Sequence, residues 1–354
     1  MANQILYGFH NLQDLKGERA TAVGIDVINT AVNNAVEEHN RLMNQLLDFF
    51  VMRTTAYSAR FSASSNARLQ PLDNSGRARP IKAGGHYDVA FPINQGGTAW
   101  GFDYVTGQKL TVGEVQNAVA TMNTADRNWV VDHVYGAILS ESNWTYNDPL
   151  KGALTIKGLA NGDTDTYSVV GGTTASTADH YLAQAAAISD AANPFPTIYN
   201  ALTKRPENSG QVIAFVPTNL VADVEALADF KELNDPNIRQ SANSDVLVGR
   251  LPANTPGRVI GYTNKVWIAE SLSLPDNYIV ATTTDGEKAL AMREDEEASL
   301  QGFKKVADRD DYPWYERQYL RRAGFGAWNR VGAVAMRIGN AAYAAPTGFE
   351  SPMG

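Results

Sequence analysis

The titratable and nucleophilic residues of this chain offer few combinations that could do chemistry. It has no cysteine, which excludes disulfides, thiolate metal sites and thiol nucleophiles. No pair of its five histidines has the i,i+4 spacing that places two metal ligands on one helix face. The histidines are His10, His39, His86, His133 and His180. His39 and His133 fall on apolar helical patterns, which favours packing over ligation. The sequence therefore predicts no catalytic, cofactor or metal site.

Other chemical signatures are absent or weak. There is neither a G-x-S-x-G nucleophile elbow nor a G-x-x-x-x-G-K-[ST] phosphate loop. The acidic run Arg293–Glu297 could bind a cation, although such runs are usually solvated faces. A hydrolase that used carboxylates such as Asp132 or Glu141 stays an alternative, but neither differs from an ordinary acid on a helix surface. We expect a protein that is not an enzyme.

A basic segment gives a stronger signal. Residues 53–82 contain Arg53, Arg60, Arg68, Arg77, Arg79 and Lys82, opposed only by Asp73, in a chain of net charge −8. Arginine suits interface ion pairs because its planar fork binds carboxylates at two points. The segment is either a solvated loop or a docking site for an acidic surface of another subunit, with nucleic acid less favoured. The expected acidic partner is the run Glu294, Asp295, Glu296 and Glu297.

The same segment lies in a long stretch with little helical periodicity. Residues 54–110 are rich in Gly, Pro, Ser and Asn, and alternating pieces at 87–93 and 99–105 suggest a two-stranded hairpin. A loop of this length is normally functional or held by a partner. Arg77 and Arg79 flank turn signals at the expected tip. Phe91 and Trp100 are the apolar alternative for contact with a neighbouring subunit.

Helices and strands alternate irregularly along the chain, which predicts an α+β protein. Apolar residues at helical spacing predict a helix over 26–53 with Asp26 as N-cap, and Thr111 with Glu114 forms a capping box that opens a helix over 111–140. That second helix would be roughly 40 Å long. Shorter helices are expected over 177–192, over 197–205 and around Leu220–Leu227. Strands are expected at 212–216, 259–262, 265–270, 277–284 and around Val334–Ile338.

Size and charge bound the class of protein. The 354 residues can bury a proper core without disulfides. A net charge of −8 argues against a dedicated reader of nucleic acid, which would normally be basic. The N-terminus has no signal-peptide pattern, and the apolar run Leu46–Met52 is too short to span a bilayer. We expect a soluble protein made in a cytoplasm, with no membrane partner.

The order of these parts resembles the major capsid proteins of tailed bacteriophages, whose fold is shared with encapsulin shells. The segments that carry the resemblance are "DPLKGALTIKGLAN", "VIAFVPTNLVADVEAL", "VIGYTNKVWIAESLSLPDNYIVATT" and "GFGAWNRVGAVAMRIGNAAYA". It implies an N-terminal arm and first helix (1–53), an extended loop (54–110), a peripheral domain with a long spine helix (111–175), an axial domain (176–305) and a peripheral return strand (306–354). The strand pair after Arg258 would then serve shape rather than chemistry.

The resemblance also implies a function and partners. The chain would self-assemble as hexamers and pentamers of an icosahedral head that encloses phage double-stranded DNA. The protein would lie near this DNA without binding it specifically. Its location would be the virion. Separate scaffolding, portal and decoration proteins are candidate partners. The start of the chain has no long charged helical extension that would indicate a fused scaffolding domain. Some relatives join a loop lysine to an asparagine covalently. Lys82 with Asn329 or Asn340 would be the candidates here, but no helping acid is evident and we expect no cross-link. An encapsulin-like shell around protein cargo is the alternative.

Overall fold

The computed structural model describes residues 12, 14–62, 69, 71–78, 86–160, 162, 167–170, 180–233, 257–310 and 314–349. The chain divides into two compact units. Unit 1 combines Met1–Asp48, Ile93–Asp132 and Arg293–Gly324, and unit 2 combines Phe49–Pro92, His133–Met292 and Phe325–Gly354. Each unit is thus assembled from three segments that are distant in sequence. The boundaries of the arm, extended loop, peripheral domain and axial domain were taken from the resemblance, and they stay predictions.

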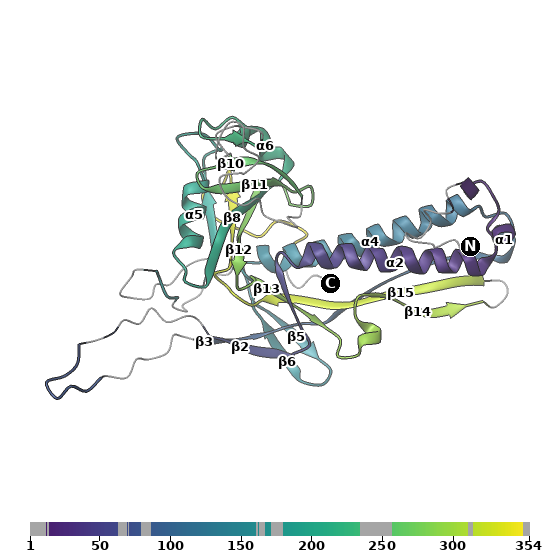
Figure 1. Ribbon diagram of the computed structural model, residues 1–354, viewed down its shortest axis with the longest axis horizontal. Helices are drawn as coiled ribbons and strands as arrows, with labels where there is room; N and C mark the ends of the chain where they lie inside the picture. The colour runs from purple at the N-terminus through teal and green to yellow at the C-terminus, as the bar shows by residue number, and fades with distance from the viewer. Residues whose placement is uncertain are drawn as a thin grey trace. The chain divides into compact units, whose positions relative to one another are not determined.

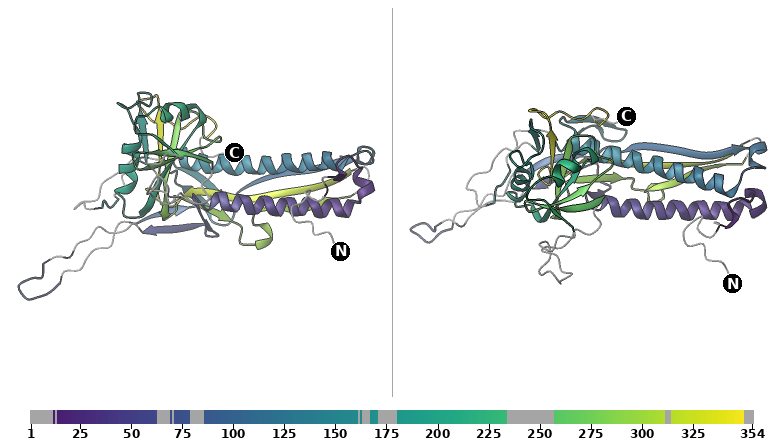
Figure 2. Two further views of the ribbon diagram at one scale, coloured as in Figure 1. Left: turned by 45° about the horizontal axis from the view of Figure 1, so that its top comes forward. Right: turned by 90° about the horizontal axis from the view of Figure 1, so that it is seen from above.

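Unit 1 contains the long helices. They are α1 (Ala20–Val23), α2 (Ile25–Leu47), α3 (Tyr104–Gly107) and α4 (Val112–Leu139), of which the part up to Asp132 belongs to this unit. The predicted capping box is confirmed: the Thr111 N–H donates to Glu114 Oε2 at 2.8 Å, and the Glu114 N–H donates to Thr111 Oγ1 at 3.3 Å. In Figures 1 and 2, α2 and α4 run side by side. The predicted spine helix is therefore present.

The predicted helix over 26–53 is correct in its body and wrong at both ends. Helix α2 begins at Ile25, after Gly24 with φ of 104°, so Asp26 lies inside the first turn and is not the N-cap. The helix ends at Leu47, and β1 (Val51–Thr54) follows as a strand. Phe49, Phe50 and Val51 are all buried. Aromatic and β-branched residues suit a strand, so tertiary burial overrides the continued helical period here.

The sheet of unit 1 packs against these helices. In it β15 (Trp314–Ala327) pairs antiparallel with β14 (Phe303–Arg309) on one side and with β4 (Asn94–Asp103) on the other. Apolar side chains from both layers form one core. Its members include Val32, Val36, Trp100, Val115, Val119, Met122, Phe303 and Tyr319. A buried sheet face covered by two helices thus fixes the positions of the polar residues described below.

The smaller sheet of unit 2 corrects the predicted hairpin. Its strand order is β2 (Ser58–Ser62), β3 (His86–Ala90), β6 (Gly152–Ile156) and β5 (Trp144–Asp148). Strand β3 pairs with β2 and β6, whereas β4 pairs with β15, so the pieces at 87–93 and 99–105 do not pair with each other. The reason is packing: Tyr87 and Val89 of β3 enter a core with Phe61, while Trp100 of β4 enters the core of unit 1.

The larger sheet of unit 2 has seven strands. Their order is β7 (Tyr181–Gln184), β16 (Ala333–Ile338), β12 (Tyr278–Gly286), β8 (Asn208–Val216), β11 (Val266–Glu270), β10 (Arg258–Thr263) and β9 (Lys231–Glu232). Helices α5 (Phe195–Thr203) and α6 (Thr218–Glu225) pack on it through a core that includes Ile198, Leu220 and Val224. All strands predicted from residue 212 onward are confirmed, as are the helices at 197–205 and near Leu220. The described residues also form β13 (Leu290–Glu294) and the 3₁₀ turn η3 (Ala298–Leu300).

A further prediction fails in unit 2. The expected helix over 177–192 is replaced by β7 from Tyr181, because this segment pairs in parallel with β16; Thr177 and Ala178 lie outside the described residues. The segment after Asn147, which includes part of the resemblance, forms a β5–β6 hairpin. Its turn is held by the Asp148 carboxylate, which accepts from the backbone N–H groups of Leu150 and Lys151. No helix among the described residues is long and apolar enough to cross a membrane.

Candidate assembly surface and a buried charge cluster

The tip of the long loop in unit 2 is a closed turn. The Asp73 carboxylate accepts from the backbone N–H groups of Ser75 and Arg77, each at 2.8 Å. The Asp73 N–H donates to the Arg77 carbonyl at 3.1 Å, and Gly76 takes a φ of 72° that favours glycine. The aspartate therefore stabilises the turn through hydrogen bonds to its backbone, a role that was not predicted from the sequence. A preformed turn loses less conformational entropy on docking than a random segment would.

The exposed side chains of this tip are apolar as well as basic. Leu69 is 93 % exposed and Leu72 is 61 % exposed, while Arg77 is exposed beside them in sequence. Arg68, Arg79 and Lys82 lie outside the described residues. Exposing two leucines costs solvation free energy that burial against another surface would recover, at about 25 cal/mol per Å² of apolar area. Neither leucine was predicted, because the basic residues and the aromatic Phe91 and Trp100 were the expected contacts.

The basic excess of the loop is smaller than the sequence suggests. Arg60 on β2 forms a two-point ion pair with Asp88 on β3, with Nε to Oδ1 at 2.7 Å and Nη2 to Oδ2 at 3.1 Å. The hydrogen bond from Arg60 holds the pKa of the Asp88 carboxyl below its usual range. Asp88 lies beyond the window 53–82, so counting charges along the chain could not find this cross-strand pair.

The acidic run is only partly available for docking. Glu294 is buried, and Asp295 forms an ion pair with Arg322 within unit 1. Asp295 also holds the following turn, since its Oδ1 accepts from the Glu297 N–H at 3.0 Å. Only Glu296 and Glu297 of the four expected residues are exposed. A docking surface for a basic loop would rest on these two.

Phe91 and Trp100 are core residues rather than interface residues. Phe91 is fully buried at 0 % exposure, and Trp100 is 5 % exposed within the core of unit 1. Neither side chain can touch another subunit without leaving the core that it fills. Among the described residues of the loop tip, the exposed large apolar side chains are instead Leu69 and Leu72.

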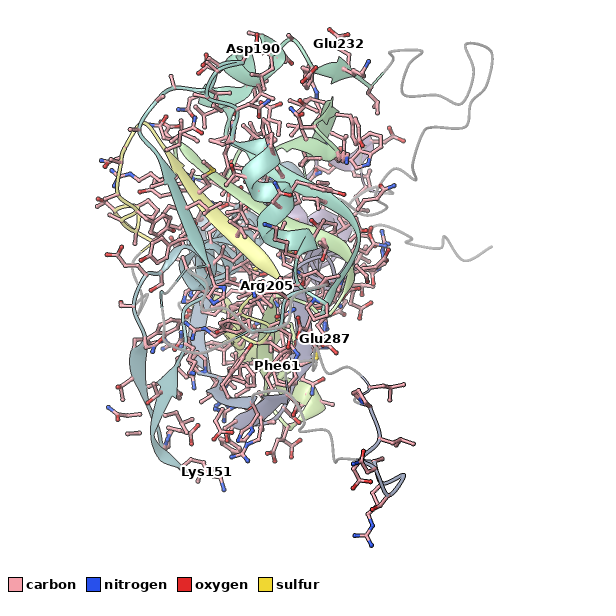
Figure 3. The ribbon with its side chains drawn as sticks, turned by 90° about the vertical axis from the view of Figure 1, so that its left-hand side faces the viewer. Phe61, Lys151, Asp190, Arg205, Glu232 and Glu287 are labelled. Carbon is pink, nitrogen blue, oxygen red and sulfur yellow. The ribbon has the colours of Figure 1, made fainter. Side chains whose placement is uncertain are left out.

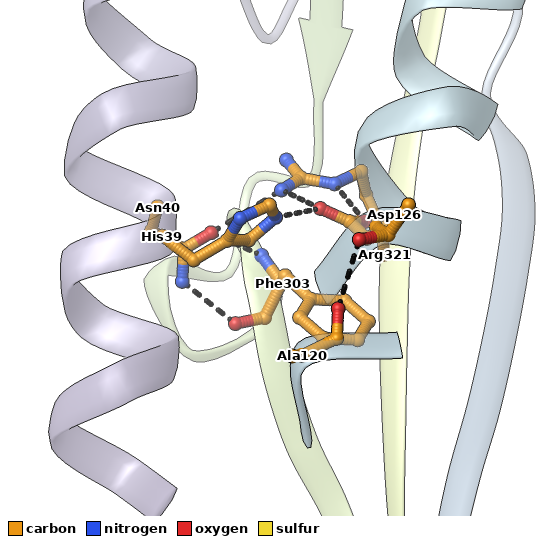
Figure 4. Close-up of polar contacts among 7 residues, drawn as sticks. His39, Asn40, Ala120, Asp126, Phe303 and Arg321 are labelled. Carbon is orange, nitrogen blue, oxygen red and sulfur yellow. Dashed lines mark hydrogen bonds and ion pairs between the residues drawn. The ribbon is translucent and has the colours of Figure 1, made fainter. Parts of the chain in front are cut away.

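A charge cluster lies at the centre of unit 1 (Figure 4). Asp126 on α4 accepts from His39 Nε2 on α2 at 2.7 Å and from Arg321 on β15, through Nε at 2.6 Å and Nη2 at 2.7 Å. The Asp126 and Arg321 side chains are 2 % and 3 % exposed, and that of His39 is 11 % exposed. A buried carboxylate with a bidentate guanidinium and an imidazole has its charge compensated on the spot.

Asn40 extends this cluster to the fourth element of the unit. Its Nδ2 donates to the Phe303 carbonyl at 2.8 Å, and its Oδ1 accepts from the Phe303 N–H at 2.8 Å and from Arg321 Nη2 at 3.2 Å. Neighbouring residues of α2 thus bind α4, β14 and β15 at one point. Burial acts to raise the pKa of Asp126, but the bonds from His39 and Arg321 outweigh it and the net pKa is lowered. The cluster therefore joins α2, α4, β14 and β15.

One sequence signal could have found Asp126. It continues the buried face of α4 set by Val115, Val119 and Met122, at a position where an apolar residue is expected. A charged residue on such a face requires a buried partner. Arg321 lies 195 positions away, so the partner itself was not predictable from spacing.

The carboxylates considered for hydrolysis stand apart from this cluster. Asp132 is half-buried on α4 and Glu141 is exposed just after that helix. Within the part of the chain that the structure describes, no group of three or more His, Asp or Glu side chains could hold a metal ion.

Comparison with known proteins places the fold. No family model matches the sequence, and no curated protein sequence matches it either. Among solved structures, a chain from Mycobacterium phage Patience is 16 % identical, with a TM-score of 0.67 over 97 % of this chain and 96 % of that one. A chain in the capsid of Ralstonia phage GP4 is 13 % identical, with a TM-score of 0.51 over 84 % of this chain and 88 % of that one. The chain therefore has the tailed-phage major capsid fold.

Proposed function

We propose that this protein is a major capsid protein that self-assembles into an icosahedral head around a phage double-stranded DNA genome. The observation that carries the proposal is the match to the capsid of Ralstonia phage GP4 over most of both chains. Its subunits would form hexamers and pentamers, with separate scaffolding, portal and decoration proteins as further partners. The protein would be made in the host cytoplasm, reside in the virion and have no enzymatic role.

The expected parts acquire roles under this function. Residues 54–110 would form the extended loop that lies on a neighbouring subunit, and α4 would be the spine of the peripheral part. The larger sheet of unit 2 would supply the axial part. A net charge of −8 suits a shell wall that lies near DNA without gripping it. Closed shells require repeated complementary contacts among identical subunits.

The loop tip is our candidate for such a contact. Leu69 and Leu72 would bury apolar surface on the neighbour, and Arg77 would reach an acidic surface such as Glu296 and Glu297. Arg68, Arg79 and Lys82 would add to the same attraction. The weight of the contact falls on the leucines, because one exposed ion pair is worth only about 0–1 kcal/mol.

Expression followed by size-exclusion chromatography and negative-stain imaging tests this function. The protein alone, or co-expressed with a scaffolding partner, should elute as particles that image as closed shells. A protein that stays monomeric under every assembly condition would contradict the proposal. The encapsulin-like alternative predicts shells filled with protein cargo, so nucleic acid and protein contents of particles purified from the native host separate the two.

A further inference from the structure

His180 in unit 2 occupies an unusual position for a titratable side chain. It is 2 % exposed, and its Nε2 has no hydrogen-bond partner. The imidazole stands edge-on to the Tyr167 ring, with the ring centroids 4.9 Å apart. A neutral imidazole tolerates such a site as an aromatic group. An imidazolium does not, because a buried charge needs a bonded partner of opposite sign.

The charged groups around His180 share the sign that an imidazolium would carry. Arg330 is 1 % exposed, and its Nη2 donates to the Gly158 carbonyl at 3.3 Å. Arg205 is 8 % exposed, and its Nη1 donates to the carbonyls of Tyr167 and Ser168, each at 3.3 Å. Figure 3 labels Arg205 beyond the end of α5. The carboxylate of Glu207 interacts electrostatically with Arg205. No described carboxylate forms an ion pair with the imidazole.

The backbone of His180 connects this site to the edge of the seven-stranded sheet. Its carbonyl accepts from the Ala335 N–H at 3.3 Å, directly before β7 begins. Strand β7 has four residues and lies at the edge of the sheet, where it pairs only with β16 among the described strands. At its other end, the Gln184 carbonyl accepts from the N–H groups of Gly339 and Asn340. A displacement of His180 would therefore act directly on the first pairing of this short strand.

We propose that His180 is an acid-sensitive latch for β7: when a solvent proton binds its imidazole, the ring leaves its site beside Arg205 and Arg330, and β7 separates from β16. The proton that enters stays on the exposed imidazolium, where water solvates it. Raising the pH removes it, and the neutral ring returns to its site. The latch belongs to the fold of unit 2 and does not depend on the proposed function.

The direction of the pH dependence follows from the two states. In the closed state, burial together with the charges of Arg330 and Arg205 lowers the pKa of His180 to about 3. In the open state the pKa returns to about 6.5. Between these values opening takes up one proton, so the opening equilibrium rises as the pH falls. The expected limit is about a tenfold increase per pH unit.

Hydrogen exchange measured by mass spectrometry tests the latch on the full-length protein from pH 7.5 to pH 4. After correction for intrinsic exchange rates, the wild-type peptide over 180–184 should lose protection by up to about tenfold per pH unit below about pH 6.5. Peptides over the central strands β8 and β11 should keep theirs. His180→Gln and His180→Phe carry no titratable group, so protection of β7 should no longer depend on pH. His86→Gln is the matched control, because His86 is exposed on β3 of the same unit.

The outcomes separate clearly. Wild-type protection of β7 that does not change with pH overturns the latch, whether or not the variants fold. A pH dependence that persists in His180→Gln also overturns it, since another group must then be titrating. If His180→Phe fails to fold, His180→Gln decides. If His86→Gln removes the pH dependence, the assignment to His180 is wrong.

Discussion

Two histidines of this protein, His39, which is partly buried, and His180, which is buried, have opposite surroundings. His39 in unit 1 meets the Asp126 carboxylate, which Arg321 also binds. His180 in unit 2 lies near two guanidinium groups, and its Nε2 has no partner. The first group belongs to a network whose charges compensate one another, and the second is compatible with its site only while neutral. The signs of the neighbouring charges therefore decide whether a histidine inside the fold stabilises it or limits its pH range.

The largest effect is expected from breaking the compensated cluster. Asp126→Ala leaves Arg321 and His39 buried without their carboxylate, which should lower the free energy of unfolding by about 3–5 kcal/mol. Denaturant titration of the unassembled subunit measures this loss. Glu38→Ala is the matched control, because it removes the exposed pair with Arg41 on the same helix α2 as His39. Its transition midpoint should stay at the wild-type value; equal midpoints for the two variants would show that the cluster contributes nothing.

Acid titration sharpens the comparison. Because the folded pKa of His180 is depressed to about 3, the unfolded state binds more protons between about pH 6.5 and pH 3. Stability should therefore fall with falling pH in this window, by at most about 1.4 kcal/mol per pH unit from this group. His180→Gln should flatten the slope. Asp126 also stabilises the folded state, because its folded pKa is lowered. That contribution is lost at more acidic pH, as the pH falls through the folded pKa of Asp126. A slope that His180→Gln leaves unchanged would contradict the assignment.

The exposed loop tip offers a contrast to both clusters, because it should affect assembly and leave the subunit stable. Leu69→Ser with Leu72→Ser should reduce particle yield strongly, with the melting temperature of the free subunit unchanged. Arg77→Glu with Arg79→Glu should weaken assembly less, and raised salt should weaken the wild type in the same direction through screening. Particle yield across a salt series measures both. If the leucine variant assembles as well as wild type, the loop is held by other contacts.

The last prediction is that no effect is seen: no covalent cross-link forms between subunits. Asn329 is 0 % exposed, and its amide Nδ2 donates to the Glu287 carbonyl at 3.4 Å and to Asn208 Oδ1 at 3.5 Å. Asn340 is exposed, but its Oδ1 accepts from the Ala342 N–H at 3.1 Å. Lys82 lies outside the described residues. Particles boiled in detergent should run as a single band at the monomer mass, and a ladder of multiples would contradict this.

Signals from residues close together in sequence correctly predicted several helices and strands. The Thr111–Glu114 capping box opened α4 as expected, and runs of β-branched residues marked β8, β11 and β12. The failures share one cause, which is pairing at a distance. The alanine-rich segment after Thr177 has a high helix propensity, yet from Tyr181 it pairs with β16, more than 150 positions later.

The candidate sites were less predictable than the fold. Counting charges found Arg77 but missed Asp88, because the Arg60–Asp88 pair forms across two strands. Aromatic residues in a loop suggested an interface, but Phe91 and Trp100, both in the second half of residues 54–110, belong to two separate cores. Neither mistake could be corrected from one sequence, since the distinction between anchor and contact depends on which residues the fold buries.

Unit 1 is built from three separated segments of the chain, and this determines when it can fold during synthesis. Its core joins Val32 and Trp100 to Phe303 and Tyr319, so the last contributors leave the ribosome long after the first. Until then the apolar faces of α2 and α4 have no sheet to cover them. Contacts this distant in sequence form slowly, and uncovered apolar helices are prone to aggregation. Newly made chains therefore cannot complete this core until Tyr319 has left the ribosome.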